Sequence, residues 1–327
     1  MSEEWSLTPK GAQQVVARAR RRLTGDSARH DLVAGVVLGV ESIPDGLAAG
    51  LLAGVNPVYG LYGYLFGTFG GALATSSAFM TVQATGAMAV IISDVPAVKS
   101  GPHAATALFT LSIITGAIML TLGLLRMGTL VRFVPNAVLT GFINAVAVNI
   151  VLGQLSDFTG YSSGAGNRVT RAVDTLLHVG SFDWPTFIIG TLTIVLIVLL
   201  EKTRLRALGL VVALIITSGI VAVFHLNSVQ TLNDIASIPS SLPRPVLPKL
   251  SLIVDLLVPA LSLALVGLVQ GAAISNSIPN PDGSYPDASG DFRGQGVANL
   301  VSGFFQGQVI TSSPFIAKYA AVGTARL

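Results

Sequence analysis

The sequence predicts an all-α polytopic membrane protein, and three observations lead to this fold class. Hydrophobic residues make up 51% of the 327-residue chain and charged residues only 11%, whereas soluble domains carry about 25% charged residues. The mean hydropathy of +0.72 agrees with this. Glycine is frequent, at 35 residues, as it is in membrane helices whose backbones approach one another closely.

The composition also excludes several classes of function. The chain has no cysteine, which excludes disulfides, thiolate metal sites and cysteine nucleophiles. The formal net charge of +3 is spread thinly, so no nucleic-acid partner is expected. The sequence contains no phosphate-binding loop, dinucleotide fingerprint, zinc-protease motif or nucleophile elbow. We therefore expect no enzymatic activity and no cofactor.

The candidate spans follow from hydropathy, because a crossing helix needs about 20 apolar residues. Residues 1–30 are polar and basic, and we interpret them as a cytoplasmic extension, since the next apolar run is too long for a signal peptide. Residues 80–93 are apolar but too short to cross fully, and 294–305 are short and weakly apolar. The expected spans are 32–53, 58–74, 104–125, 136–155, 187–200, 208–224 and 252–277.

The distribution of Lys and Arg favours a cytoplasmic N-terminus. If residues 80–93 count as one crossing, twelve basic residues fall inside and five outside. The asymmetry is weaker if that stretch re-enters the side on which it started. We expect a multi-pass protein of the cell inner (plasma) membrane. The interior loop 278–292 contains three aspartates but lacks calcium-loop spacing, so we expect a solvated turn.

The first span carries Glu41, Pro44 and Asp45. Each carboxylate near the bilayer centre costs about 2.5–3.5 kcal/mol. Glu41 and Asp45 are four residues apart and share one helix face, and Pro44 frees the carbonyl of Val40. Acidic residues inside a membrane usually line a pathway or an ion site. The alternative is that the span starts later and Glu41 lies near the interface.

Residues 75–93 combine a polar start, with Thr81 and Gln83, and a short run of small residues. At 1.5 Å per residue this segment is too short to span. It predicts a half-helix that begins in mid-membrane, with free N–H groups and a positive dipole end facing a cavity. Such termini bind anions in proteins and hold substrates in secondary transporters. The alternative is a short ordinary span preceded by a polar loop.

Two further features concern helix packing. Gln270 is a large polar side chain in an apolar helix; it either bonds a neighbouring helix or faces the substrate, and its position alone favours neither. Gly60, Gly63, Gly67 and Gly71 have spacings of three and four, which indicates close helix contact and a structural role.

The stretch Ile43–Tyr62, IPDGLAAGLLAGVNPVYGLY, resembles the first-helix signature of the SulP sulfate permeases and related anion exchangers. Residues 132–141, 264–272 and 296–305 resemble the starts or cores of later family helices, so the resemblance covers about 31–308. It implies two inverted repeats of seven segments, of which this chain would hold the first repeat and the start of the second. It also implies facing half-helices at the third and tenth segments, and a core domain that moves against a gate domain.

The resemblance assigns roles by position. Asp45 stands where the family commonly has a first-helix Gln near the substrate, and Gln270 where many members have a Glu. An acid at position 45 repels an anion unless it is protonated or paired with a cation. We therefore hypothesise that the coupling carboxylate has moved to Glu41 or Asp45, with Na⁺ or H⁺ as the coupling ion. The expected substrate-binding residues are Asp45, Gln83, Ala84, Thr85, Gly86 and Gln270.

The function implied is secondary active transport, by symport or antiport, of an inorganic anion of the sulfate, bicarbonate or chloride class. The expected organisation is an extension at 1–30, a partial transport domain with segments one to nine at 31–308, and an atypical, frameshifted or truncated tail at 309–327. No STAS domain is expected, and this chain alone is expected not to transport. A nucleobase-type permease and a non-transporting membrane scaffold stay open as alternatives. The expected partners are a small anion, the lipid bilayer and, as an open alternative, a second copy of the chain.

Overall fold

A computed structural model describes residues 27–77, 80–99, 102–128, 135–203, 208–235, 239, 241–275, 279–280 and 283–313. Within these ranges the regular structure is helical apart from one two-stranded sheet, which confirms the all-α fold class. Residues 1–26 of the expected extension and residues 314–327 of the expected tail lie outside the described residues. Four described helices are long and apolar enough to cross a membrane, at Ala34–Leu52, Ala104–Leu124, Trp184–Glu201 and Leu250–Ser275.

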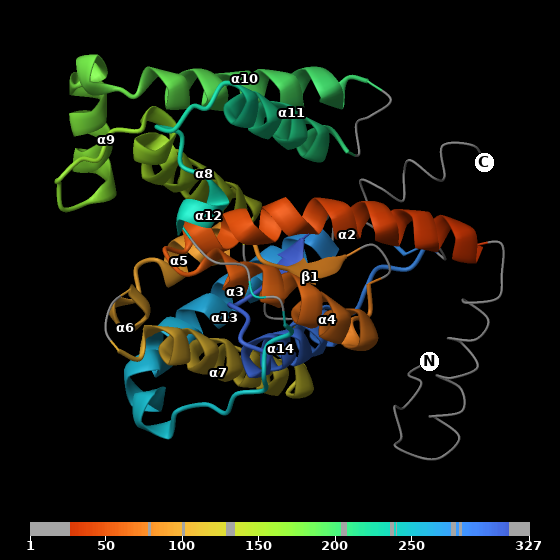
Figure 1. Cartoon of the computed structure of the whole chain (residues 1–327). Coiled ribbons are helices and arrows are strands. Elements are labelled where there is room, and N and C mark those ends of the chain that lie inside the picture. The colour runs from red at the N-terminus through yellow and green to blue at the C-terminus, as the bar shows by residue number, and fades with distance from the viewer. Residues whose placement is uncertain are drawn as a thin grey trace.

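The helices form two layers, which we call the core layer and the outer layer (Figure 1). The core layer contains α2 (Ser27–Leu52), α3 (Pro57–Tyr62), the π-helix η1 (Gly63–Gly67), α4 (Thr68–Ala74), α5 (Gly86–Ile92), α6 (Pro96–Lys99), α7 (Ala104–Leu124), η4 (Leu250–Leu252), α13 (Ile253–Ser275) and α14 (Ala288–Phe304). The outer layer contains α8 (Asn136–Thr159), α9 (Arg168–Leu177), η3 (Val179–Ser181), α10 (Trp184–Glu201) and α11 (Gly209–Val223), and α12 (Leu232–Ile235) follows it.

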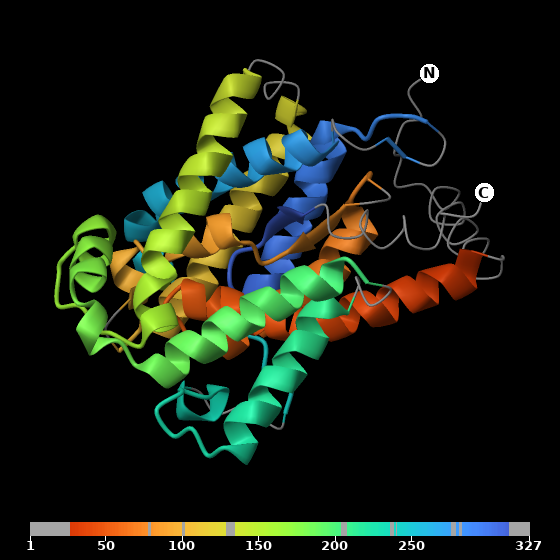
Figure 2. The ribbon, with the colours of Figure 1, turned by 90° about the horizontal axis from the view of Figure 1, so that it is seen from above.

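The two layers meet along α2, α5 and α13. Helix α11 contacts α2, and α8 contacts α2, α5 and α13. Figure 2 shows α8 crossing the core helices, with α10 and α11 in front of them. All the expected spans appear as helices at close to the expected residues, because hydropathy fixes where a chain can enter lipid. Helix α8 continues to Thr159 and ends at Gly160, whose φ of 69° suits a glycine C-cap.

The glycine series on the second span has the structural role that its spacing predicts. A Cβ at Gly60 would lie 2.0 Å from the carbonyl oxygen of Gly46, and a Cβ at Gly67 would lie 2.0 Å from Cδ1 of Ile310. Gly63 also faces Ile310, and Gly71 faces Val82. The second span therefore packs its glycine face directly on α2 and on the sheet segments, which confirms the prediction.

The sheet is an element that the sequence does not predict. Strand β1 (Thr81–Gln83) pairs antiparallel with β2 (Thr311–Ser313), and Thr81 lies opposite Ser313. Its residues are buried. Asn299 of α14 holds the chain just before β2, because its amide donates to the carbonyl of Ile310 at 2.8 Å and accepts from the N–H of Ile310 at 2.8 Å. The amide of Asn299 thus replaces a backbone partner for that residue.

The structure has no visible boundary at the expected start of the tail. Val309 and Ile310 are both 0% exposed, and β2 continues the core layer to Ser313. This segment carries few local signals, since its position depends on pairing with a strand far away in the sequence.

The solvated turn expected at residues 278–292 is wrong for its C-terminal part. Asp291 is only 1% exposed. One carboxylate oxygen accepts from the hydroxyls of Thr75 and Ser76, both at 2.8 Å, and from two backbone N–H groups at 3.0 and 3.1 Å. The other oxygen accepts from the hydroxyl of Ser275. Asp291 therefore joins the end of α4 to the end of α13, and Asp287 caps α14.

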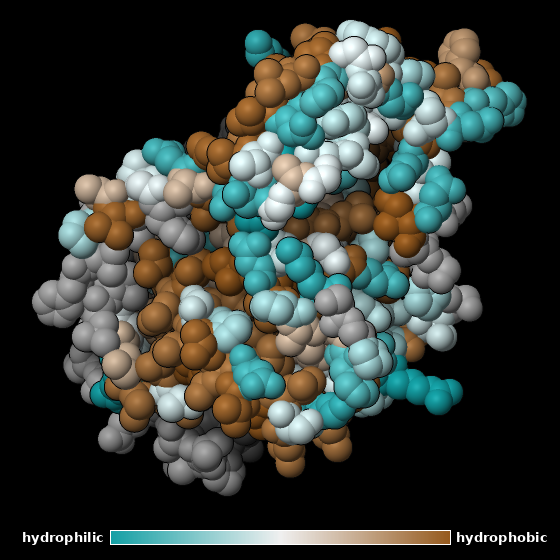
Figure 3. Space-filling model, turned by 90° about the vertical axis from the view of Figure 1, so that its left-hand side faces the viewer, coloured by the Kyte–Doolittle hydropathy of each residue, from teal (hydrophilic) through white to brown (hydrophobic). Residues whose placement is uncertain are grey.

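The surface of the described residues is largely apolar. Figure 3 shows a broad field of hydrophobic side chains over the lower half of one face and more hydrophilic residues over its upper half. Exposed large hydrophobic residues occur along α8, α10, α11 and α13. An apolar surface of this extent is what a lipid-facing protein presents.

Candidate functional site

One cavity lies at the meeting of the two layers and has a volume of about 470 Å³. Its wall is formed by α2, by the segment that joins β1 to α5, by α8, by α13 and by the end of β2. The lining residues are Asp45, Ala48, Ala49, Leu52, Gln83, Ala84, Thr85, Gly86, Ile150, Gln154, Gln270 and Ser313. The structure therefore brings all six expected substrate residues together around one space.

The chain breaks where the sequence predicts a half-helix. Thr85 is extended, with φ −130° and ψ 153°, and α5 begins at Gly86 and ends at Ile92. Seven residues rise only about 10 Å, and the segment before them is the buried strand β1. The alternative of an ordinary short span is excluded for this segment. The first-turn N–H groups of α5 have no acceptor within the helix, and the cavity lies at this end.

Several side chains around the cavity have polar atoms without partners. Oε1 of Gln83, Oγ1 of Thr85 and Oε1 of Gln270 are buried and make no hydrogen bond to any described residue. Gln83 is only 2% exposed. Buried polar atoms are almost always satisfied in folded proteins, so the expected partner of the two amide oxygens is a hydrogen-bond donor such as water, while the Thr85 hydroxyl can donate or accept. Gln270 lines this cavity, which favours the alternative in which it faces the substrate, and its role in binding stays a prediction.

The two carboxylates of the first span have different surroundings. Asp45 lines the cavity, and its Oδ2 accepts a hydrogen bond from the hydroxyl of Tyr64 in η1. Glu41, one turn earlier on α2, is 4% exposed and is not part of the cavity wall. The candidate membrane span Ala34–Leu52 includes Glu41. Pro44 lies inside the continuous helix α2.

Seven residues at or next to the site are absent from the sequence prediction, three of them the apolar residues Ala48, Ala49 and Leu52 of α2. Ile150 and Gln154 come from α8, and Gln154 could have been noticed as an amide in an apolar span. Ser313 lies at the end of β2, beyond the expected domain boundary. Tyr64 carries no signal in the sequence, because only the fold brings its hydroxyl to Asp45.

The chemistry of the site combines donors with one acid. Backbone N–H groups, amide groups and a hydroxyl can together bind a negative ion, while Asp45 supplies a carboxylate beside them. Among the described residues, no group of three or more His, Cys, Asp or Glu side chains could hold a metal ion. The site is therefore suited to a small solute held by hydrogen bonds.

Comparisons with known proteins agree with this geometry. The model of the "Sulfate permease family" matches residues 28–316. The chain is 30% identical over 288 residues to "Putative sulfate transporter YbaR" of Bacillus subtilis (strain 168), covering 85% of this chain and 54% of the relative. It is 29% identical to "Probable sulfate transporter 4.2" of Arabidopsis thaliana, and the match covers 86% of this chain and 43% of that relative. The chain thus spans about half the length of these curated relatives.

Two solved structures have the same fold. "The transmembrane domain of a cyanobacterium bicarbonate transporter BicA" superposes with a TM-score of 0.78 at 22% identity, covering 92% of this chain and 78% of that one. Murine Slc26a9, described as an anion transporter in the inward-facing state, superposes with a TM-score of 0.82 at 19% identity. The superposition covers 99% of this chain and 58% of that one. The likeness at these identities concerns the fold.

Proposed function

Because this chain belongs to the sulfate permease family, we propose that it serves secondary active transport of a small inorganic anion across a membrane. The observation that carries the proposal is the start of α5 at Gly86, which opens into a cavity between two helix layers that is also lined by the side chains of Gln83, Thr85 and Gln270. Relatives named as sulfate transporters support sulfate as the first anion to test. The nucleobase and scaffold alternatives receive no support from these relatives.

The proposed binding step needs no change in the α5 backbone. The anion lies at the N-terminus of α5 and accepts hydrogen bonds from first-turn N–H groups, from the hydroxyl of Thr85 and from the amides of Gln83 and Gln270. The positive end of the helix dipole adds about 0.3–1 kcal/mol, and more in a partly buried site. A site built from such donors recognises charge and size, and therefore accepts several small anions.

Asp45 is the proposed coupling residue, because it faces the same cavity. An ionised carboxylate next to an anion is repulsive. The repulsion disappears when Asp45 binds a proton or when Na⁺ lies between the two charges. The Tyr64 hydroxyl orients the Asp45 carboxylate, and Glu41 on the same helix face is the second candidate. Anion and cation then promote each other's binding, which is the thermodynamic basis of symport.

The proposed transport cycle moves the two layers against each other. The cavity is lined by both layers, so a rotation or sliding of one layer opens it to one side at a time. We place the N-terminus in the cytoplasm and the protein in the inner (plasma) membrane, on the distribution of basic residues. Two inverted seven-segment repeats remain part of this proposal.

Anion binding to the purified protein tests the proposal directly. We expect sulfate, bicarbonate or chloride to raise the unfolding temperature, because a ligand at about 100 times its Kd stabilises the folded state by about 2.7 kcal/mol. The variant Gln270→Leu should weaken the binding about tenfold, the effect of losing a hydrogen bond to a charged ligand. Ser262→Ala, an exposed change on the same helix, is the matched control. If none of these anions binds, or if Q270L and S262A behave alike, the proposed site is wrong.

The coupling role of Asp45 has its own test. Anion affinity of the unmodified protein should rise with Na⁺ or with falling pH, by about 5- to 150-fold for a typical coupling energy. Asp45→Asn should remove this dependence, since an amide binds neither ion as a carboxylate does. An unchanged dependence in D45N would refute the role of Asp45 and leave the anion site itself untouched.

A further inference from the structure

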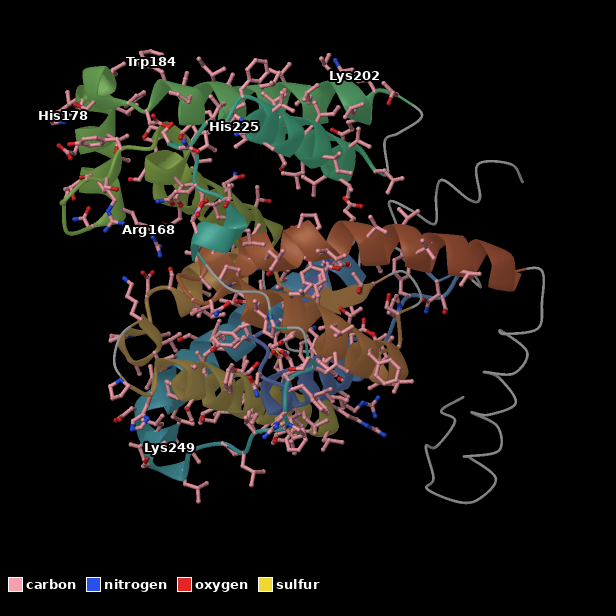
Figure 4. The ribbon with its side chains drawn as sticks, viewed as in Figure 1. Arg168, His178, Trp184, Lys202, His225 and Lys249 are labelled. Carbon is pink, nitrogen blue, oxygen red and sulfur yellow. The ribbon has the colours of Figure 1, made fainter. Side chains whose placement is uncertain are left out.

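Arg168 joins the outer layer to the far end of α5. It is the first residue of α9, yet its guanidinium contacts the core layer at three residues. One terminal nitrogen lies 3.0 Å from Oδ1 of Asp94 and 3.4 Å from the carbonyl oxygen of Val90, and it also donates to the hydroxyl of Ser93. The other lies 3.3 Å from Oδ2 of Asp94. In Figure 4, Arg168 extends from the lower end of α9 toward this turn.

The arginine is held in place by its own layer. Its other terminal nitrogen also donates to Oδ1 of Asn149 on α8 at 2.8 Å. The aliphatic part of Arg168 lies over Gly153, where a Cβ would come within 3.7 Å of Cδ of the arginine. The next residues of these same turns of α8, Ile150 and Gln154, line the cavity. Arg168 therefore contacts the same two turns of α8 that reach the cavity, and it lies at the C-terminal end of α5, opposite the end that faces the cavity.

We propose that Arg168 is a positioning residue that latches the outer layer to the C-terminal end of α5 and closes the cavity on the α9 side. This inference rests on the proposed transport function, in which the two layers move. Val90, Ser93 and Asp94 belong to the core layer, whereas Arg168 and Asn149 belong to the outer layer, so movement of the layers on this side breaks the contacts. A cation at the C-terminus of a helix is favourable, and a two-pronged pair with a carboxylate is a strong hydrogen-bonded arrangement.

The strength of the latch suits a part that opens and closes. The Arg168 side chain is 23% exposed and that of Asp94 is 61% exposed. Water therefore screens this pair, and such pairs contribute little individually. The contact favours one arrangement of the layers without locking it, while Asn149 keeps the arginine in place when α5 moves away.

Cysteine accessibility tests the latch, because the chain contains no cysteine of its own. Ala48 lines the cavity and is exposed to it, so Ala48→Cys reports whether the cavity is open. A membrane-impermeant maleimide is applied separately to each face of membranes that contain the full chain. In A48C with Arg168→Gln, labelling from the α9 face should be about fivefold faster than in A48C alone, which corresponds to about 1 kcal/mol. Asp94→Asn should have a similar effect, and the double variant should add little to either.

The matched control is Arg171→Gln, which removes the same charge from the same helix. Equal labelling rates in A48C and A48C/R168Q would overturn the proposal, and so would an equal increase in A48C/R171Q. The exchanged pair Arg168→Asp with Asp94→Arg should restore slow labelling if the charges act on each other. If the exchanged pair does not restore slow labelling, and R168Q speeds labelling no more than R171Q does, then Arg168 acts only as one of several surface charges. Labelling does not depend on anion binding, so this result stands apart from the test of the proposed function.

Discussion

The core layer and the outer layer are built on different principles. In the core layer, α7 and α14 pack through fully buried side chains such as Leu108 and Met119, and the buried side chains of Asn299 and Asp291 each make several hydrogen bonds. In the outer layer, no residue of α10 is buried among the described residues, and hydroxyls such as those of Thr191 and Thr193 bond carbonyls of their own helix. The difference indicates that the core layer fixes the geometry of the site, while the outer layer provides a movable wall.

The largest loss of stability is expected on substitution of Asp291, because its one buried carboxylate accepts hydrogen bonds from five donors. Asp291→Ala leaves the hydroxyls of Thr75, Ser76 and Ser275 without their acceptor. Each buried donor left without an acceptor costs about 1–3 kcal/mol, so the loss of one acceptor by several donors should lower the unfolding temperature of the purified protein strongly. Asp287→Ala, which removes an exposed N-cap nearby, should cost only about 1 kcal/mol. Equal losses of stability in D291A and D287A would contradict the view that the buried hydrogen bonds of Asp291 stabilise the core layer.

The next largest loss of stability is expected on substitution of Asn299. Asn299→Ala removes both hydrogen bonds to Ile310 and leaves two buried backbone groups unsatisfied, at about 1–3 kcal/mol each. Strand β2 should loosen, and hydrogen exchange at residues 309–313 should accelerate more than in α10. Anion binding should weaken as well, because Ser313 lines the cavity. If exchange near β2 is unchanged, the support assigned to Asn299 is wrong.

A smaller effect is expected in the outer layer, where Asp183 caps α10. Hydrogen bonds from the Thr186 hydroxyl and backbone hold the pKa of Asp183 below its ordinary value. A lowered pKa means that the cap contributes stability above the ordinary Asp pKa of about 4 and loses it as the pH falls through the lowered value. Protection from hydrogen exchange in the first turn of α10, measured relative to the intrinsic rate at each pH, should therefore fall in acid. Asp183→Asn should flatten this response, and a steep response in D183N would contradict the assignment.

Sequence patterns predict the parts of the molecule that depend on local chemistry. Hydropathy locates the spans, and a polar start on a short apolar run predicts the break before Gly86. The position of Asp45 in the first span predicts a polar face, and Asp45 lines the cavity, while Glu41 does not and the other α2 residues of the wall are apolar.

The unpredicted parts depend on contacts between distant segments. The pairing of β1 with β2 joins Thr81 to Ser313, and the hydroxyl of Tyr64 reaches Asp45 only in the folded chain. Arg168 has the same character, since nothing near it in the sequence indicates Asp94 as its partner. Asp291 was expected in a solvated loop because an acidic, turn-rich segment usually is one. Its burial depends on the ends of α4 and α13, which no local pattern brings together.

The central claim is that the start of α5 binds an anion between the two layers. Crystals grown with selenate, a sulfate analogue, or with bromide give anomalous signal that locates the ion directly. The account predicts a peak in the cavity beside the N–H groups that follow Thr85, with the oxygens of a selenate centred on that peak about 2.7–3.2 Å from these nitrogens. An anion bound elsewhere, with this cavity free of anomalous signal, would contradict the account.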